Sequence, residues 1–458
     1  MLELGGNLDI WYFTATGIRR LSSAKLHTYY LCVILSFAYL LLKYRDHDTS
    51  KYIIFLFFYG LFGYLGKDIQ NYYKIAATCL VIFWFIKTNS SPAFRELRFL
   101  TFSFSFFSIT FIYTAILNSD YLLITLSQYS KHLIVFLAFI ILYRLRDRTS
   151  FKIYLESLLF HLLIVQILLS IIKFIVMGNV ESIVGSINSQ GGAAATTLPI
   201  LGFMYIWLKN KGLLYPKDWL FIAGLVFIGF VSLKRAIWFI LPIIVFLFYF
   251  YVPKKKLTKK VLILSILAIP LIFYFGVRLN FLLNKERVTW GSFDYNYVMD
   301  TSMNYMFGKN REKGTMSGRG GATYQVFTKF IRGNLTEKDW FGYGLRYMFA
   351  TSKLDFYKLK TGVKLKGSAT GIFQNLVSRG YLGIFATILF TLSIIMKTRN
   401  YRLRIVLLIF FFWEYLFYTG IVFKNYALSF VFIYLVVFSE SNIEVSRRKE
   451  FNRWSLAW

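Results

Sequence analysis

The chain has 458 residues, of which 57% are hydrophobic and 20% aromatic, and its mean hydropathy is +0.54. This composition excludes an ordinary soluble protein and indicates one that is embedded in a membrane. The 53 basic residues outnumber the 22 acidic ones, giving a net charge of +31. In a membrane protein this surplus favours anionic lipid or a polyanionic substrate as partner over nucleic acid.

Apolar runs long enough to cross, or nearly cross, a bilayer recur along the chain, about thirteen in all. They begin near Thr28, Tyr52, Tyr72, Phe99, Leu122, Ile153, Ala193, Trp219, Ala236, Val261, Tyr381, Ile405 and Tyr426. We expect an all-α polytopic integral membrane protein with about 12–14 transmembrane helices. Its parts are an N-terminal transmembrane region, 1–276, a long polar loop with short helices, 277–370, and C-terminal transmembrane helices with a basic tail, 371–458.

Clusters of Lys and Arg in the short connections predict the orientation of the helices. The cytoplasmic segments should be 144–152, 254–260, 397–404 and the tail after Glu444. Helix parity then places the long loop outside, although thirteen helices would also place the amino end outside with Arg19 and Arg20. We expect that one helix among the first five is miscounted.

The long loop carries sixteen Lys and Arg residues against seven Asp and Glu residues. Long translocated loops cross a membrane whatever their charge, so orientation does not explain this surplus. One explanation is a solvated surface that faces anionic lipid headgroups. The other is a binding site for a phosphate-bearing substrate, with Arg311 and Arg346 among its candidate cations.

Two arginines are the main candidates for an anion site at the outer face. Arg319 lies in Ser317–Gly318–Arg319, just before a stretch with apolar residues at helical spacing, and a helix start after glycines offers free backbone N–H groups. Arg235 lies in a very short outer turn, Ser232–Trp238. A guanidinium fork matches phosphate oxygens, so the pair could bind one phosphate-bearing ligand together.

The order of these motifs resembles the O-antigen polymerase and O-antigen ligase family of polytopic membrane glycosyltransferases. The resemblance spans roughly Asn188 to Gly383. It comprises, in order, a polar outer loop with Asn188, the Ser-x-x-Arg turn with Arg235, the Ser-Gly-Arg helix start, the turn Phe341–Gly344, and Gln374 followed by Gly380-x-x-Gly383.

The resemblance implies a GT-C-like fold in the bacterial inner membrane, with the active site facing the periplasm. It implies metal-independent, inverting glycosyl transfer without a cofactor. Donor and acceptor would be glycans on undecaprenyl diphosphate, the product an O-antigen of lipopolysaccharide or a capsule, and the other partners membrane lipid and a chain-length regulator protein. Arg235 and Arg319 would hold the diphosphate, with Asn188 and Gln374 in the substrate site.

One departure favours polymerase over ligase. Ligases of this family tend to carry a His-Asn pair before the glutamine, and this chain has Ala369-Thr370 there and no histidine from 162 to 458. O-antigen ligase or protein O-oligosaccharyltransferase remains the alternative. A flippase or transporter of the same lipid-linked glycans is a rival in another class, but no internal symmetry of the kind common in transporters is visible.

Glu414 is the sharpest candidate for a general base, because a carboxylate inside an apolar run is costly and usually marks a site or an internal ion pair. The alternative is a structural pair with Lys131, Lys173 or Lys424. Lys131, beside Gln128, could reach the diphosphate or could extend to the membrane surface.

Overall fold

Two compact units make up the chain in the computed structural model. By internal contacts, unit 1 comprises Met1–Gln70 and Ser150–Phe293, and unit 2 comprises Asn71–Thr149 and Asp294–Trp458. The structure describes residues 11–14, 17–20, 23–58, 61, 67–118, 122–177, 183–187, 193–232, 236–253, 270–271, 273–278, 283–286, 288, 290–307, 336–345, 370–416, 418, 420 and 422–439. The predicted three-part division along the chain stays a prediction, because most of 277–370 lies outside these residues.

Helices account for nearly all the regular structure of the described residues, as the sequence predicts. The exception is an antiparallel hairpin of β1 (Trp11–Thr14) and β2 (Gly17–Arg20). Twelve of the thirteen predicted apolar runs coincide with helices, and the run near Val261 lies outside the described residues. One start was wrong: the helix expected near Tyr381 begins at Gly371.

Unit 1 is a bundle whose central helix is buried on all sides. Its helices are α1 (Ser23–Lys43), α2 (Asp48–Phe57), α8 (Thr149–Met177), α9 (Ala193–Lys209), α10 (Pro216–Val231) and α11 (Ala236–Phe246), which the π-helix η1 (Leu247–Tyr251) continues. Every residue of α9 from Ala194 to Leu208 is buried. Gly202 lets α10 approach closely, since a Cβ there would lie 2.5 Å from Leu225 Cδ1.

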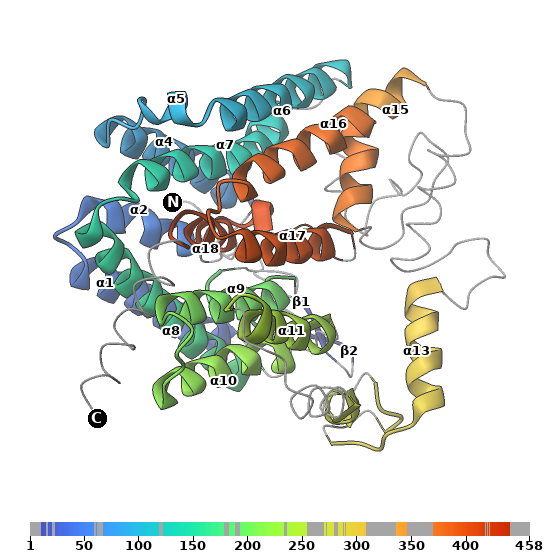
Figure 1. Cartoon of the computed structure of the whole chain (residues 1–458). Coiled ribbons are helices and arrows are strands. Elements are labelled where there is room, and N and C mark those ends of the chain that lie inside the picture. The colour runs from blue at the N-terminus through green and yellow to red at the C-terminus, as the bar shows by residue number, and fades with distance from the viewer. Residues whose placement is uncertain are drawn as a thin grey trace, which may run out of the picture. The chain divides into compact units, whose positions relative to one another are not determined.

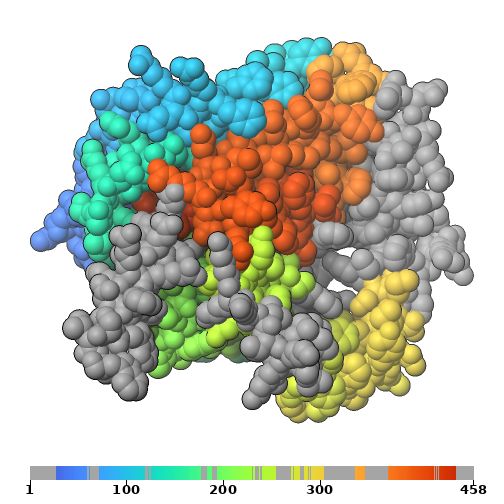
Figure 2. Space-filling view, viewed as in Figure 1, coloured from blue at the N-terminus to red at the C-terminus, as the bar shows by residue number. Residues whose placement is uncertain are grey.

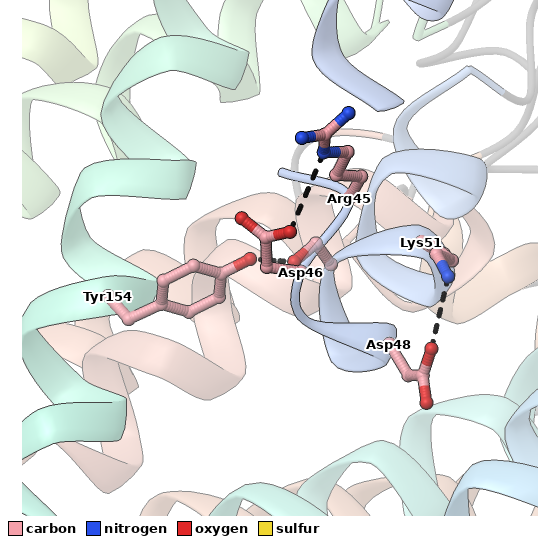
Figure 3. A network of polar contacts seen from close by, with 6 residues as sticks. Arg45, Asp46, Asp48, Lys51 and Tyr154 are labelled. Atoms are coloured by element: carbon pink, nitrogen blue, oxygen red, sulfur yellow. Dashed lines mark hydrogen bonds and ion pairs between the residues drawn. The ribbon is translucent and has the colours of Figure 1, made fainter. Parts of the chain in front are cut away.

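Polar contacts hold the connection between α1 and α2 in unit 1 (Figure 3). Arg45 pairs with Asp46 at 3.6 Å, and Lys51 pairs with Asp48 at 3.1 Å. Tyr154 of α8 shares a hydrogen bond with Ser50 of α2. Both ion pairs are exposed and should each contribute at most about 1 kcal/mol, so they fix a local turn and define no ligand site.

Unit 2 is built around two antiparallel neighbours, α6 and α16 (Figure 1). Its elements are α4 (Lys67–Lys87, which begins in unit 1), α5 (Ala93–Glu96), α6 (Arg98–Leu117), α7 (Leu122–Leu145), α13 (Tyr295–Phe307), α15 (Glu337–Phe341), α16 (Gly371–Ile395), α17 (Tyr401–Leu416), the 3₁₀ helix η4 (Val422–Lys424) and α18 (Tyr426–Val437). Ser103 Oγ of α6 lies 2.8 Å from Ser393 Oγ, near the end of α16. In the space-filling view α16 and α17 form a continuous surface beside α6 (Figure 2).

Four helices of the described residues are long and apolar enough to cross a membrane. They are α6, α7 from Thr125, α8 to Val176, and α16. Exposed apolar side chains such as Ile109, Ile116 and Phe385 cover parts of their surfaces, as expected for helices in contact with lipid. The helices thus support a membrane-embedded protein, whereas the number 12–14 stays a prediction.

Two of the basic connections meet at one end of unit 2. Arg146 Nη2, after α7, lies 3.7 Å from Glu96 Oε2, and Lys397 Nζ, after α16, donates to the Glu96 carbonyl at 3.1 Å. The segments 144–152 and 397–404 therefore share one end, as their predicted cytoplasmic location requires. The turn after α15 and the first half of α16 lie at the opposite end, where Asn118 Nδ2 donates to the Gly342 carbonyl at 3.3 Å.

Candidate functional site

A small, partly open cavity lies inside unit 2. Its volume is about 20 Å³, enough for a water-sized group but not for a sugar ring. The lining comes from α6, α7, α16, α17 and the η4 segment, and consists of Phe111, Gln128, His132, Asn375, Arg379, Thr387, Phe411, Glu414, Tyr415, Gly420, Phe423 and Lys424. Titratable side chains buried among membrane-spanning helices usually mark a functional site.

Arg379 is the central cation of this cavity, and its side chain is 2% exposed. Its Nη2 donates to Asn375 Oδ1 and, at 2.6 Å, to Thr387 Oγ1, both on the same helix. The guanidinium carbon lies 4.8 Å from the centre of the Phe107 ring, close enough for a cation–π contact. Its Nε and Nη1 have no hydrogen-bond partner within the described residues.

A break in α16 places Arg379. Gly380 has φ +65° and ψ −168°, a conformation that is essentially restricted to glycine. A Cβ at Gly380 would lie 2.4 Å from the backbone of Trp340, and a Cβ at Gly342 would lie 2.3 Å from the backbone nitrogen of Arg379. The two backbones can therefore lie this close only because both positions are glycine.

The turn that follows α15 donates hydrogen bonds to the carbonyl groups of α16 that the break leaves free. Tyr343 N donates to the Val377 carbonyl at 2.8 Å, and Gly344 N donates to the Ser378 carbonyl at 3.1 Å. The Tyr343 ring also packs with Leu376 and Val377 in a small apolar core. The turn Phe341–Gly344 and the Gly380-x-x-Gly383 segment, predicted separately from the sequence, thus form one interlocked structure.

The turn itself is held from two sides. Thr336 and Asp339 form a capping box at the start of α15, and the Tyr343 hydroxyl donates to Asp339 Oδ1 at 3.1 Å. On α6, Thr114 Oγ1 donates to the Phe341 carbonyl at 2.7 Å. These contacts fix the position of the turn and, through the interlock, that of Arg379.

Two lysines and a histidine lie in or near the cavity. Lys424 Nζ donates to Gln374 Oε1 at 2.8 Å, and the charges of Lys424 and Arg379 repel each other. Lys131 and His132 follow one another on α7, and both experience the charge of Lys424. His132 also faces Arg379, and its Nδ1 has no hydrogen-bond partner within the described residues.

Glu414 is the only carboxylate in the lining given above, and it is 1% exposed. Its charge attracts Lys424, so Lys424 is the lysine among the three predicted partners that the structure brings to it. The site therefore contains more positive than negative charge. In a medium of low polarity such a surplus favours an anion.

The residues predicted for the site, together with the predicted partner Lys173, fall into three groups. Lys131, Gln374 and Glu414 are brought together in unit 2. Lys173 belongs to unit 1, where its Nζ lies 5.5 Å from the centre of the Tyr29 ring. The other predicted residues, Arg235, Arg319, Asn188, Arg311 and Arg346, lie outside the described residues.

Sequence reasoning missed Arg379, His132 and Asn375. An arginine directly before the first glycine of Gly380-x-x-Gly383 was a visible signal, but we expected that glycine at the mouth of a helix rather than within one. His132 comes from α7, far from the stretch where the missing ligase histidine was sought.

Within the described residues no three His, Cys, Asp or Glu side chains gather as a metal site would require.

Comparison with protein-family models and with curated protein sequences gives no match to this chain.

Proposed function

We propose that the protein is a polytopic membrane glycosyltransferase of the bacterial inner membrane. In this proposal it polymerises undecaprenyl-diphosphate-linked repeat units into a surface polysaccharide at the periplasmic face. The observation that carries the proposal is the interlock in unit 2. Two motifs of the family resemblance, Phe341–Gly344 and Gly380-x-x-Gly383, pack together beside a buried cationic cavity.

The chemistry would be an inverting displacement at the anomeric carbon of the donor sugar. The acceptor hydroxyl oxygen forms the new bond to that carbon, its proton passes to a base, and the bond to the diphosphate oxygen breaks. The electron pair leaves with the diphosphate, whose negative charge grows in the transition state. Cations placed around that group stabilise the transition state, and arginine could do so without a metal ion.

O-antigen ligase and protein O-oligosaccharyltransferase would share this donor chemistry and differ only in the acceptor. The products of the reaction distinguish these two enzymes from a polymerase. A polymerase gives a ladder of glycans that are still lipid-linked, whereas a ligase or an oligosaccharyltransferase transfers glycan to lipid A core or to protein. We favour the polymerase because no histidine occupies the position that ligases use.

The interruption of α16 favours a flippase of the same lipid-linked glycans as the second candidate. Transporters commonly bind their substrates where a membrane helix is broken, and the break at Gly380 lies directly beside Arg379. A flippase would move the donor across a vesicle membrane without changing it. In detergent there is no membrane for the donor to cross. Polymer formed by the purified protein in detergent would therefore show that the protein is not only a flippase.

The proposal is tested at the two arginines that the resemblance assigns to the diphosphate. We expect Arg319→Ala and Arg235→Ala each to abolish polymer while the protein still inserts into the membrane. Loss of a charge-assisted contact to the leaving group should cost about 3 kcal/mol, or roughly a hundredfold in rate. Lysine at either position should rescue poorly, since it keeps the charge and loses the fork.

The matched control is Arg404→Ala. The guanidinium of Arg404 donates to the Thr398 carbonyl at 2.7 Å, at the end of unit 2 that carries the basic connections. This variant should make normal ladders. Normal ladders from Arg319→Ala and Arg235→Ala, at wild-type protein levels, would contradict the proposed role of both residues.

A further inference from the structure

We propose that unit 2 binds the headgroup of an acidic phospholipid at the end that carries the basic connections. The site is a basic seam between residues 95–98, where α5 ends and α6 begins, and residues 396–397, directly after α16. Its cations are Arg95, Arg98 and Lys397. The seam lies at the opposite end of unit 2 from the Phe341–Gly344 turn, so this inference goes beyond the proposed function and does not depend on it.

The seam is a close contact between two helices of unit 2. α6 and α16 run side by side (Figure 1), and near this end Ser103 Oγ of α6 lies 2.8 Å from Ser393 Oγ of α16. At the seam itself, Lys397 Nζ donates to the Glu96 carbonyl at 3.1 Å. This bond places Lys397 directly beside the start of α6.

Positive charge gathers at this end of unit 2, and little negative charge opposes it. Three stretches form the end: 93–98, 144–149 and 396–404. Together they contain nine Lys and Arg residues against two acidic residues. Both acidic side chains pair with one arginine, since Arg146 lies 3.7 Å from Glu96 and 3.4 Å from Asp147. The surplus of positive charge favours an anionic partner.

Arg95 and Arg98 supply exposed charge at the seam. Both residues are exposed, and neither forms an ion pair within the part of the chain that the structure describes. Arg98 is also the first residue of α6, where the positive end of the helix dipole disfavours a cation, and the first turn of α6 contains no acidic residue. A negative group bound between the two arginines would relieve this repulsion.

Lys397 differs from a freely solvated surface lysine. It is partly buried, and burial, followed by the charge of Arg146, lowers its pKa below the usual value. A phosphate beside Nζ would offset both effects. Basic residues that only orient the helices need no fixed position, because their charge alone acts. The position of Lys397 at the Glu96 carbonyl therefore favours a binding site over orientation alone.

Exposed apolar side chains adjoin these cations and indicate the kind of partner. Phe99 and Phe102 on α6, and Met396 beside Lys397, are all exposed. A phospholipid matches this arrangement, because its phosphate can contact the cations while its acyl chains cover the apolar side chains. A nucleotide or an acidic protein segment would leave these apolar side chains uncovered. We therefore assign the seam to a lipid.

The test is thermal melting of the purified full-length protein in an uncharged detergent. The probe is phosphatidylglycerol, and the comparison is phosphatidylcholine, whose headgroup has no net charge. A ligand that binds only the folded state raises the melting temperature. We expect phosphatidylglycerol to raise that of the wild type by about 3 °C or more, and phosphatidylcholine to leave it unchanged.

The double variant Arg95→Gln, Arg98→Gln should lose at least half of the shift that phosphatidylglycerol gives. Its melting temperature without lipid should stay close to that of the wild type, because both residues are exposed. Lysine at both positions should restore most of the shift, since it keeps the charge. If the double variant does not fold, Lys397→Met replaces it, with the same loss expected.

The matched control removes two exposed positive charges from unit 1, in the double variant Lys43→Gln, Lys217→Gln. It should keep the full shift. An equal loss in the control and in the arginine variant would show a diffuse effect of charge and overturn the site. A wild type that phosphatidylglycerol does not stabilise would overturn it as well.

Glycerol 3-phosphate distinguishes a lipid from a free phosphate ester, because it carries the phosphate without acyl chains. It should not raise the melting temperature at the same concentration. A shift as large as that given by phosphatidylglycerol would overturn the assignment to a lipid. None of these measurements involves glycosyl transfer, so a failure of this site would leave the proposed function unaffected.

Discussion

Glu414 can have one of two roles, a general base in catalysis or a structural partner of a buried lysine, and the two roles require different surroundings. It is 1% exposed and attracts Lys424, which also bonds Gln374. A general base must give up such compensation to reach the acceptor hydroxyl, whereas a structural partner keeps it. The position of Glu414 beside Lys424 favours the structural role.

We therefore expect Glu414→Gln to lower the free energy of unfolding by about 3 kcal/mol, because buried Lys424 would lose the negative charge that attracts it. Thermal melting in detergent measures this, and adding Lys424→Met to the variant should recover part of the loss. Glu96→Gln, at an exposed carboxylate, should leave the melting temperature unchanged. A stable Glu414→Gln protein that binds substrate and cannot turn it over would make Glu414 the base.

At the scale of elements, the interlock of the Phe341–Gly344 turn with α16 is the feature on which the cavity depends. We expect Gly380→Ala to destabilise the protein by at least about 3 kcal/mol, because the φ and ψ values at this position are restricted to glycine and the new Cβ would clash with the Trp340 backbone. Thermal melting and yield in detergent report the loss.

The comparison for Gly380→Ala is Gly224→Ala on α10. There the added Cβ would meet only the end of the Ile167 side chain, at 2.8 Å, and a side chain can move where a backbone cannot. We expect Gly224→Ala to lower the melting temperature slightly and Gly380→Ala to lower it strongly. Equal, mild effects at both positions would show that the turn does not constrain α16.

The sequence predicted the helices well and this interlock only in part. Apolar runs identify helices because lipid and core both require apolar surfaces, so twelve of the thirteen predicted runs coincide with a helix. The first half of α16 was not predicted, because four polar residues lower the hydropathy of this segment. They are Gln374, Asn375, Ser378 and Arg379. Gln374 bonds Lys424 and Asn375 bonds Tyr415, 50 and 40 residues further along the chain, and such long-range pairing cannot be read from the residues of one segment.

At the scale of the whole molecule, the two ends of unit 2 should lie on opposite sides of the membrane. We expect a cysteine at Glu337, exposed on α15, to react with a membrane-impermeant maleimide from the periplasm. A cysteine at Arg148, exposed after α7, should react only after lysis. Both belong in a background in which Cys32 and Cys79 are replaced by serine.

Equal labelling of the two cysteines in intact spheroplasts would contradict the orientation. The reverse pattern would place the turn beside Arg379 in the cytoplasm. In that case lipid-linked glycans at the periplasmic face could not reach the cavity, and the polymerase proposal would fail with the orientation.

The interlock also pins both flanks of segment 346–369 to a single helix. Gly344, just before the segment, bonds Ser378 of α16, while Thr370, just after it, is the N-cap of the same helix. Because these anchors are already close, doubling the length between them should cost only about 0.6 kcal/mol of loop-closure entropy. An affinity tag or a fiducial domain inserted between these two anchors, away from the candidate cation Arg346, should therefore have little effect on the fold of the helices.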